Sequence, residues 1–387
     1  MYLCIVFQNM PRYLAQILNK YTVFLAVLLL ISCTEKKQER IVTPWGEVLD
    51  SVETSEGFDL HEIQHSGQMI LATISGPQTY YDYHGKQLGT QFLLVQRLAD
   101  RVGVAIRVEV CRDSVELAAK FAEGQVDIVA WPTPGNLEVN KDKPLLAEEF
   151  KEWYKPEMIA EVKKEETALL TTQRVKRHVF SPMLDKKGGI ISHYDKLFMQ
   201  YSQPIRWDWR LMAAQCYQES TFDPKAVSFA GAKGLMQIMP GTADLLGLPR
   251  DKMYDPEQNI AAAAKYLGQL EGNLSDIKDR VERTNFILAS YNGGLHHIRD
   301  AMALAKRDGK NPHRWRDVSE YVLKLASPQY YNDPIVKHGY MRGSETVDYV
   351  AKIRQRHQGY MGVKTPHLGF HPSAPRKAEK RKNKYDI

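Results

Sequence analysis

The stretch from Ala213 to Thr242, AAQCYQESTFDPKAVSFAGAKGLMQIMPGT, carries the strongest structural and chemical signals in the chain. It begins as an apolar helix that ends in Gln218-Glu219-Ser220, and glycines at 231 and 234 follow before Pro240 closes the block. A carboxyl at the carboxyl end of a helix lies near the negative end of the helix dipole. That position, like an apolar surrounding, raises the pKa of a carboxyl. A raised pKa suits a general acid that works near neutral pH.

The composition is that of a globular protein. The chain has 387 residues, which suggests two or three domains. Hydrophobic residues make up 43% and charged residues 25%, and no apolar run reaches the roughly 18 residues of a spanning helix. These values exclude a collagen-like, disordered or polytopic membrane protein. The net charge of +6 comes from residues 1–32 and 376–387, so the neutral body between them predicts no nucleic-acid partner.

The amino terminus has the pattern of an export signal. Residues 21–32, YTVFLAVLLLIS, form a short uncharged apolar block behind Arg12 and Lys20, which is typical of a secretory signal and too short to span a membrane. The block runs into Ser32-Cys33, which resembles the bacterial lipoprotein signal, in which cleavage exposes a cysteine that carries acyl chains. We therefore expect a signal peptide at 1–32, lipidation of Cys33 and a polar tether at 33–60. Several acyl chains anchor firmly, at about 0.8 kcal/mol per buried methylene.

Residues 61–170 alternate between strands and helices, which predicts a small α/β lobe with a parallel sheet. The lobe resembles the first half of a type 3 periplasmic solute-binding protein. The charged stretch at 145–166 leaves no room for a second half, so we expect a scaffold or regulatory role rather than solute capture. Cys111, in this lobe, and Cys216 are expected to be two buried thiols. The predicted strands are 69–73, 104–110 and 125–131, and the predicted helices are 89–103 and 114–124.

Residues 175–360 are expected to be mainly helical, which gives the whole chain an α+β class. Asp208 is placed to cap a helix over 209–220 by accepting from its first amides. Residues 361–387 form a basic tail that is most simply solvated. Further helices are predicted at 259–272, 283–294 and 344–358.

The block around Glu219 resembles the SLT-type lytic transglycosylase domain, which has a lysozyme-like fold and cleaves peptidoglycan glycan strands. The later SYNGG at 290–294 and ETVDYV at 345–350 also match this family at suitable distances. With a lipoprotein signal and a solute-binding-like lobe in front, the arrangement most resembles the membrane-bound lytic transglycosylase F group, although its amino-terminal domain looks halved. The matching residues of the block are Glu219-Ser220, Phe222, Pro224, Ala226, Ser228, Gly231-Ala232, Gly234-Leu235-Met236-Gln237, Met239-Pro240 and Thr242.

The resemblance implies roles for particular side chains. Glu219 would be the single catalytic acid and base. Ser228 would hold the N-acetyl group or ring of the muramic acid. No metal or other cofactor is predicted, because the adjacent His296 and His297 do not share a helix face. The remaining implied substrate residues are Gln237 and Met239 along the sugar subsites, Tyr291 and Asn292 around Glu219, and Glu345 and Tyr349 across the cleft.

The implied activity is that of a carbon–oxygen lyase of the cell wall. It would break the β-1,4 bond between N-acetylmuramic acid and N-acetylglucosamine without water and leave 1,6-anhydro ends, for wall remodelling or turnover. The expected partners are glycan strands and, through Cys33, a membrane. The expected location is the outer membrane, facing the periplasm. The sequence does not identify its protein partners.

Three other interpretations remain open. A goose-type lysozyme on the same fold would hydrolyse the bond and would need a second carboxylate, for which Asp223, Asp244 or Glu345 can be proposed. A non-catalytic wall-binding lipoprotein would not need the intact Glu219. A solute sensor would use the α/β lobe as its working part, and the missing second half argues against it.

Overall fold

The computed structural model describes residues 41–42, 48–49, 58–132, 136–171 and 175–363. The residues from Phe58 onward group into one compact unit, separate from those before it. Ahead of Phe58, the described residues are two short antiparallel strands, β1 (Ile41–Val42) and β2 (Val48–Leu49).

Several predictions about the two ends of the chain fall outside the described residues. These include Cys33, the signal peptide and most of the basic tail. Among the residues that the structure describes, no helix is both long and apolar enough to cross a bilayer.

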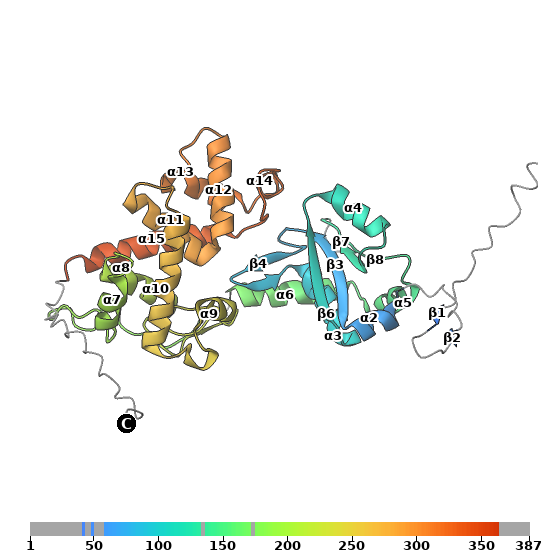
Figure 1. Cartoon of the computed structure of the whole chain (residues 1–387), viewed down its shortest axis with the longest axis horizontal. Coiled ribbons are helices and arrows are strands. Elements are labelled where there is room, and N and C mark those ends of the chain that lie inside the picture. The colour runs from blue at the N-terminus through green and yellow to red at the C-terminus, as the bar shows by residue number, and fades with distance from the viewer. Residues whose placement is uncertain (1–40, 43–47, 50–57, 133–135, 172–174, 364–387) are drawn as a thin grey trace, which may run out of the picture. The chain divides into compact units, whose positions relative to one another are not determined.

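The first part of the compact unit is a four-stranded sheet with helices on both faces (Figure 1). Its strand order is β6-β3-β7-β8, in which β3 runs parallel to β6 and β7, whereas β8 runs antiparallel to β7. The predicted parallel strands are confirmed, and β8 adds an edge strand that the sequence analysis missed. The elements are α2 (Leu60–Ser66), β3 (Gln68–Ile74), α3 (Thr90–Val102), β6 (Ala105–Cys111), α4 (Ser114–Ala122), β7 (Ile128–Ala130), β8 (Leu137–Val139), α5 (Pro144–Trp153) and α6 (Glu157–Thr171).

The residues of β3 alternate between the two faces of this sheet, as the period of a strand requires. Met69 and Leu71 are buried in a cluster that includes side chains of α2, α3 and α5. Ala72 and Ile74 are buried on the other face, against Leu117 of α4. Because both faces are covered, β3 has a nearly continuous apolar sequence rather than an alternating one.

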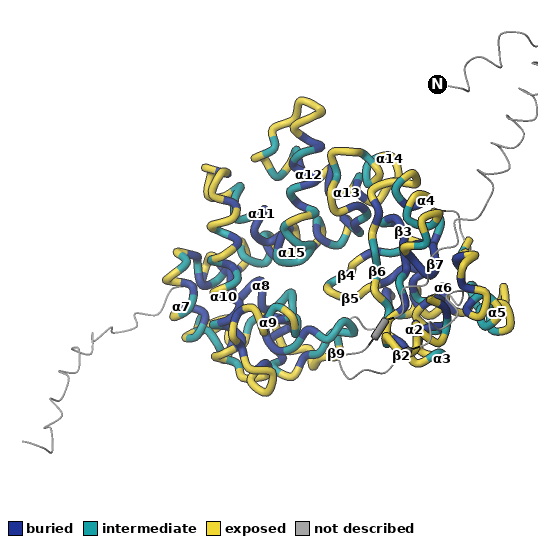
Figure 2. The backbone as a smooth tube through the Cα atoms, turned by 45° about the vertical axis from the view of Figure 1, so that its right-hand side comes forward, coloured by how far each residue is buried: buried dark blue, intermediate teal, exposed yellow. Residues whose placement is uncertain are grey.

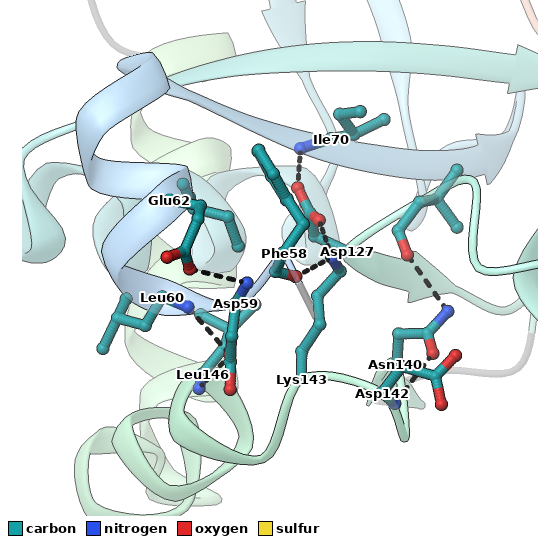
Figure 3. A network of polar contacts seen from close by, with 12 residues as sticks. Phe58, Asp59, Leu60, Glu62, Ile70, Asp127, Asn140, Asp142, Lys143 and Leu146 are labelled. Carbon is teal, nitrogen blue, oxygen red and sulfur yellow. Dashed lines mark hydrogen bonds and ion pairs between the residues drawn. The ribbon is translucent and has the colours of Figure 1, made fainter. Parts of the chain in front are cut away.

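A network of buried polar groups fixes the start of the compact unit (Figure 3). Lys143 and Asp127 form an ion pair with 3.0 Å between Nζ and Oδ1, and their side chains are 7% and 2% exposed. Lys143 also donates to the Phe58 carbonyl at 2.6 Å, and Asp127 accepts from the Ile70 amide at 2.6 Å. These additional hydrogen bonds offset the cost of burying two charges. The Phe58 backbone is therefore held by the lobe, although the sequence analysis placed this residue in the tether.

The rest of the compact unit is helical and has one continuous hydrophobic core. Helix α8 (Trp209–Ser220) is buried along most of its length (Figure 2). Asp208 caps α8 by accepting from the Arg210 amide at 3.0 Å, as predicted. The other elements are β9 (Val175–Lys176), α7 (Asp195–Ser202), β10 (Val227–Ser228), α9 (Pro240–Leu246), the 3-10 helix η2 (Arg250–Lys252), α10 (Pro256–Asn273), α11 (Arg280–Gly293), α12 (Leu295–Arg307), α13 (Trp315–Lys324), α14 (Pro328–Tyr331) and α15 (Gly343–Tyr360).

The α+β class is confirmed, and Cys111 and Cys216 are both buried free thiols, as predicted. The structure adds a regular element at residues 76–86, between the predicted strand at 69–73 and the predicted helix at 89–103. These residues contain β4 (Tyr81–Tyr83), which pairs with β5 (Lys86–Leu88) in a short antiparallel hairpin. Its alternation of buried tyrosines around an exposed Asp82 covers three residues only, too few for the period to be recognised.

Candidate active site

Glu219 lies in the last turn of α8 and is partly buried. The Tyr349 hydroxyl, from α15, donates to Glu219 Oε1 at 2.5 Å. Gln215, one turn earlier on α8, donates to the same tyrosine oxygen at 3.1 Å. Gln215 and Tyr349 are both buried, so a chain of hydrogen bonds from two helices holds the Glu219 carboxyl.

Burial raises the pKa of Glu219 to about 7. The hydrogen bond from Tyr349 and the positive charge of Arg177 act in the opposite direction and lower it. Desolvation is thus the largest cause of the raised pKa, which the sequence analysis had assigned jointly to the helix end and an apolar surrounding. A carboxyl with this pKa retains enough protonated form at neutral pH to act as a general acid.

No other carboxyl of the described residues contributes to the pKa shift of Glu219. Each of the three carboxylates that a hydrolase was expected to use has other partners. The arrangement therefore places one carboxyl among neutral hydroxyl and amide groups, with the positive charge of Arg177 nearby. The partners are the His178 and Lys225 amides for Asp223, Arg250 for the exposed Asp244, and Arg342 for Glu345.

Tyr291 and Asn292 come from the end of α11 and reach two different neighbours. The Tyr291 hydroxyl donates to the Met236 carbonyl at 2.8 Å, and the nearby Glu219 carboxylate contributes to the raised pKa of this tyrosine after burial. Asn292 Oδ1 accepts from the Thr346 hydroxyl at 2.8 Å, which joins α11 to α15. Tyr291 therefore belongs to the Glu219 group, whereas Asn292 connects two of its supporting helices.

Ser228 and Gln237 lie in the glycine-containing loop that follows α8. The Ser228 hydroxyl oxygen accepts from the Ala232 amide at 2.9 Å. The Gln237 amide donates to the carbonyls of Ala226 and Gly234, at 3.2 and 2.9 Å, and only 8% of the residue is exposed. Gln237 thus supports the loop with its nitrogen, and its Oε1 is buried without a protein partner.

Asn259 of α10 holds this loop and was not singled out from the sequence. Its buried amide nitrogen donates to the carbonyls of Lys233 and Met253, at 3.1 and 2.8 Å. Its Oδ1 accepts from the Met236 amide at 2.8 Å. Gly234 lies so close that a Cβ on it would be 2.4 Å from the Met253 carbonyl oxygen, which requires glycine there. The available signal was a single asparagine in the apolar pattern NIAAAAKYL.

Glu345 and Met239 lie against the β4–β5 hairpin of the α/β lobe. The Tyr83 hydroxyl donates to Glu345 Oε2, and Arg342 Nη2 is 3.1 Å from Glu345 Oε1. A Cβ on Gly85, at the hairpin turn, would be 2.9 Å from Met239 Cε. The lobe therefore contributes groups beside two predicted sugar-binding residues, a contribution that the sequence analysis did not foresee.

No cluster of three or more His, Cys, Asp and Glu side chains that could hold a metal ion occurs in the part of the chain that the structure describes. His296 does lie near another histidine, with its ring centroid 4.6 Å from that of His338. His297 is partly buried, and burial lowers its pKa to about 4. The His297 ring is therefore neutral at ordinary pH.

Residues 196–313 match the family model described as the transglycosylase SLT domain. The chain is 40% identical over 175 residues to a membrane-bound lytic murein transglycosylase F from Pseudomonas putida, a match that covers 45% of this chain and 35% of the relative. A protein of the same name from Maricaulis maris is 41% identical over 165 residues, which cover 43% of this chain and 35% of that protein. The chain thus spans about a third of the length of these curated relatives.

Among solved structures, the 70-kDa soluble lytic transglycosylase from Escherichia coli is similar over 43% of this chain and 24% of its own, with 24% identity and a TM-score of 0.29. The family match includes Glu219 and the loop that follows it, and it ends before Glu345 and Tyr349. The helical part of the chain therefore matches the transglycosylase SLT domain, and the chain is similar to the membrane-bound lytic murein transglycosylase F proteins.

Proposed function

We propose that this chain is a peptidoglycan lytic transglycosylase that cleaves the β-1,4 bond between N-acetylmuramic acid and N-acetylglucosamine, in remodelling or turnover of the wall. The proposal depends on one observation: Glu219 is partly buried, has a pKa of about 7 and accepts a hydrogen bond from Tyr349. The SLT match over residues 196–313 supports the same substrate class.

The reaction needs only one carboxyl because water takes no part in it. Protonated Glu219 donates its proton to the bridging oxygen, the bond from that oxygen to C1 of the muramic acid breaks, and the glucosamine leaves with a new hydroxyl. The Glu219 carboxylate then removes the proton from the muramic C6 hydroxyl, whose oxygen attacks C1 and closes a 1,6-anhydro ring. Glu219 ends the cycle protonated again. Glycosidases that use water commonly need a second carboxylate.

The other site residues are assigned to holding the sugar. Ser228 would hold the N-acetyl group or ring of the muramic acid, and Met239 would offer an apolar side chain to a sugar ring. Tyr291, Asn292 and Glu345 would shape the subsites. Tyr349 would position the sugar and also the Glu219 carboxyl. Gln237 would act mainly through the loop, because its amide nitrogen is already bonded to carbonyls of that loop.

Mass spectrometry of digested sacculi tests the proposal directly. We expect muropeptides with anhydromuramyl ends, each lighter by one water than a hydrolytic product and resistant to borohydride reduction. Reducible ends throughout would identify a hydrolase instead. No digestion of intact sacculi or of isolated glycan strands by the folded protein would favour a wall-binding role.

The pH dependence should follow the Glu219 proton. Because Glu219 must be protonated to act, kcat/KM should fall as the pH rises through about 7. Tyr349→Phe removes a hydrogen bond that lowers this pKa. The fall of kcat/KM at high pH, the basic limb of the profile, should therefore move to higher pH, and kcat should decrease. Tyr254→Phe, at an exposed tyrosine, is the control and should keep the wild-type profile. An unmoved limb in Tyr349→Phe would contradict the assignment of the limb to Glu219.

We also propose that acyl chains on Cys33 anchor the protein to the outer membrane, facing the periplasm. The apolar block that ends before Cys33 and the names of the relatives support this proposal. Cys33→Ala should release the protein into the soluble periplasmic fraction or leave an uncleaved precursor. Cys4→Ala, ahead of the same block, should fractionate as the wild type does. Detergent-dependent membrane association of cleaved Cys33→Ala would refute the anchor.

A further inference from the structure

The segment that enters the helical part of the chain, residues 175–178, contacts both β10, which carries Ser228, and the end of α8, which carries Glu219. Strand β9 pairs with β10, where Val175 lies opposite Ser228. After β9 the chain continues through Arg177 to His178, whose backbone is bonded to the residues that follow α8. The His178 amide donates to Asp223 Oδ2 at 2.6 Å, and the Thr221 hydroxyl donates to the His178 carbonyl at 2.9 Å.

Arg177 binds the end of the helix that carries Glu219. Its Nη1 donates to the Glu219 carbonyl at 2.8 Å and to the Gln218 carbonyl at 3.4 Å. The last carbonyls of a helix have no partners within the helix, and a cation there also complements the negative end of the helix dipole. In α8, the Tyr217 carbonyl accepts from the Thr221 amide. Arg177 donates to the two carbonyls that follow it, those of Gln218 and Glu219.

The backbone just after Glu219 has a conformation that its residues do not favour by themselves. Thr221 and Phe222 both have positive φ, at 53° and 64°, which is unfavourable for residues with a Cβ. A surrounding structure must therefore impose the conformation that ends α8 just after Glu219. Arg177 and the backbone bonds of His178 supply that constraint from outside the helix.

We propose that Arg177 is a positioning residue for Glu219, which it orients by binding the carbonyls at the end of α8. The proposal rests on the proposed function of Glu219 as the general acid. It places a required residue before residue 196, where the match to the SLT family begins.

Four side chains interact electrostatically with the Glu219 carboxyl, and Arg177 is the one that carries a charge. The others are Tyr349 of α15, Tyr291 of α11 and Cys216 of α8, and burial raises the pKa of all three, so that they are neutral at ordinary pH. The Arg177 charge lowers the pKa of Glu219. On the far side, Arg356 of α15 donates to the Gln218 side chain at 3.3 Å and faces Arg177. Loss of the Arg177 charge must therefore raise the pKa of Glu219.

The test uses the full chain with Arg177→Met, Arg177→Lys and the control Lys187→Met, which removes a charge from an exposed position in the following loop. A carbon-13 NMR titration follows the Glu219 carboxyl, which is assigned with Glu219→Gln. Rates are then measured on sacculi across pH. The titration needs no glycan cleavage, so it gives a result even if the proposed function fails.

In Arg177→Met, the Glu219 pKa and the basic limb should both move up, and kcat should fall by roughly 10-fold to 10²-fold from misplacement of the carboxyl, with KM little changed. Arg177→Lys keeps the charge but not the guanidinium geometry, so its Glu219 should titrate close to wild type while kcat falls partially. Lys187→Met should match the wild type in both measurements. The proposal would be overturned if Glu219 in Arg177→Met titrated as in the wild type and kcat were unchanged. If that variant does not fold, full kcat in Arg177→Lys would overturn it.

Discussion

Glu219→Gln should lower the release of anhydromuramyl products by at least ~10²-fold, because the amide can neither give a proton to the bridging oxygen nor take one from the C6 hydroxyl. The substitution keeps the shape of the side chain and its ability to accept from Tyr349. Mass spectrometry and turbidity of sacculi measure the loss. Glu152→Gln, at an exposed position on α5, is the control and should keep full activity. Digestion near the wild-type rate by Glu219→Gln would remove Glu219 from the mechanism.

The same variant should show that the loss is chemical and not structural. The folded-state pKa of Glu219, about 7, exceeds its ordinary value of 4.5, so the folded protein holds this proton more tightly than the unfolded chain. Stability of the wild type therefore decreases as the pH rises from 4.5 to about 7. Glutamine has no proton to lose. At pH 8, Glu219→Gln should melt at or above the wild-type temperature, and the difference should shrink towards pH 5.

Asn259→Ala should be the most destabilising of the substitutions considered. It removes three hydrogen bonds and leaves the buried Met236 amide and the Met253 carbonyl without partners, whereas the Lys233 carbonyl still accepts from the Ile238 amide. Each unsatisfied buried group costs about 1–3 kcal/mol, so the free energy of unfolding should fall by roughly 2 kcal/mol or more. Urea unfolding measures this change through the midpoint at constant slope.

The effect of Asn259→Ala should extend to activity in the surviving folded protein. The loop that Asn259 holds carries Gln237 and the Met236 carbonyl that accepts from Tyr291. Gln258→Ala, at the preceding exposed position, removes a similar amide and should change stability little. If the two variants unfold at the same urea concentration, Asn259 does not support the loop in the way its hydrogen bonds indicate.

The sequence predicted those features that depend on neighbouring residues. Helix α8 could be placed because Asp208 caps it and an apolar pattern follows, and β3 because its apolar residues are contiguous. Partners far apart in sequence could not be worked out from spacing. Tyr349 lies 130 residues from Glu219, and only the family resemblance suggested their proximity.

The hydrogen-bond partners of individual side chains also could not be predicted from the sequence. Gln237 is predicted to line a sugar subsite, and the structure adds that its amide nitrogen bonds to carbonyls of its own loop, which no spacing indicates. Asn259 and Arg177 have no motif that marks them, because each acts on backbone carbonyls whose position only the folded chain defines. Residues that hold the backbone of a site are therefore harder to predict than those that carry its chemistry.

The contact between the β4–β5 hairpin and Glu345 makes each of the two parts of this chain depend on the other. Tyr83 donates to Glu345 and its ring stacks on Phe229, with 5.8 Å between the ring centroids. A recombination event that joined the helical part to a different lobe would leave the Glu345 carboxyl without this hydroxyl and expose an aromatic surface, at a cost of about 25 cal/mol per Å². The effects of substitutions at Tyr83, Phe229 and Glu345 are thus expected not to add, because the three side chains share one contact between the lobe and the helical part.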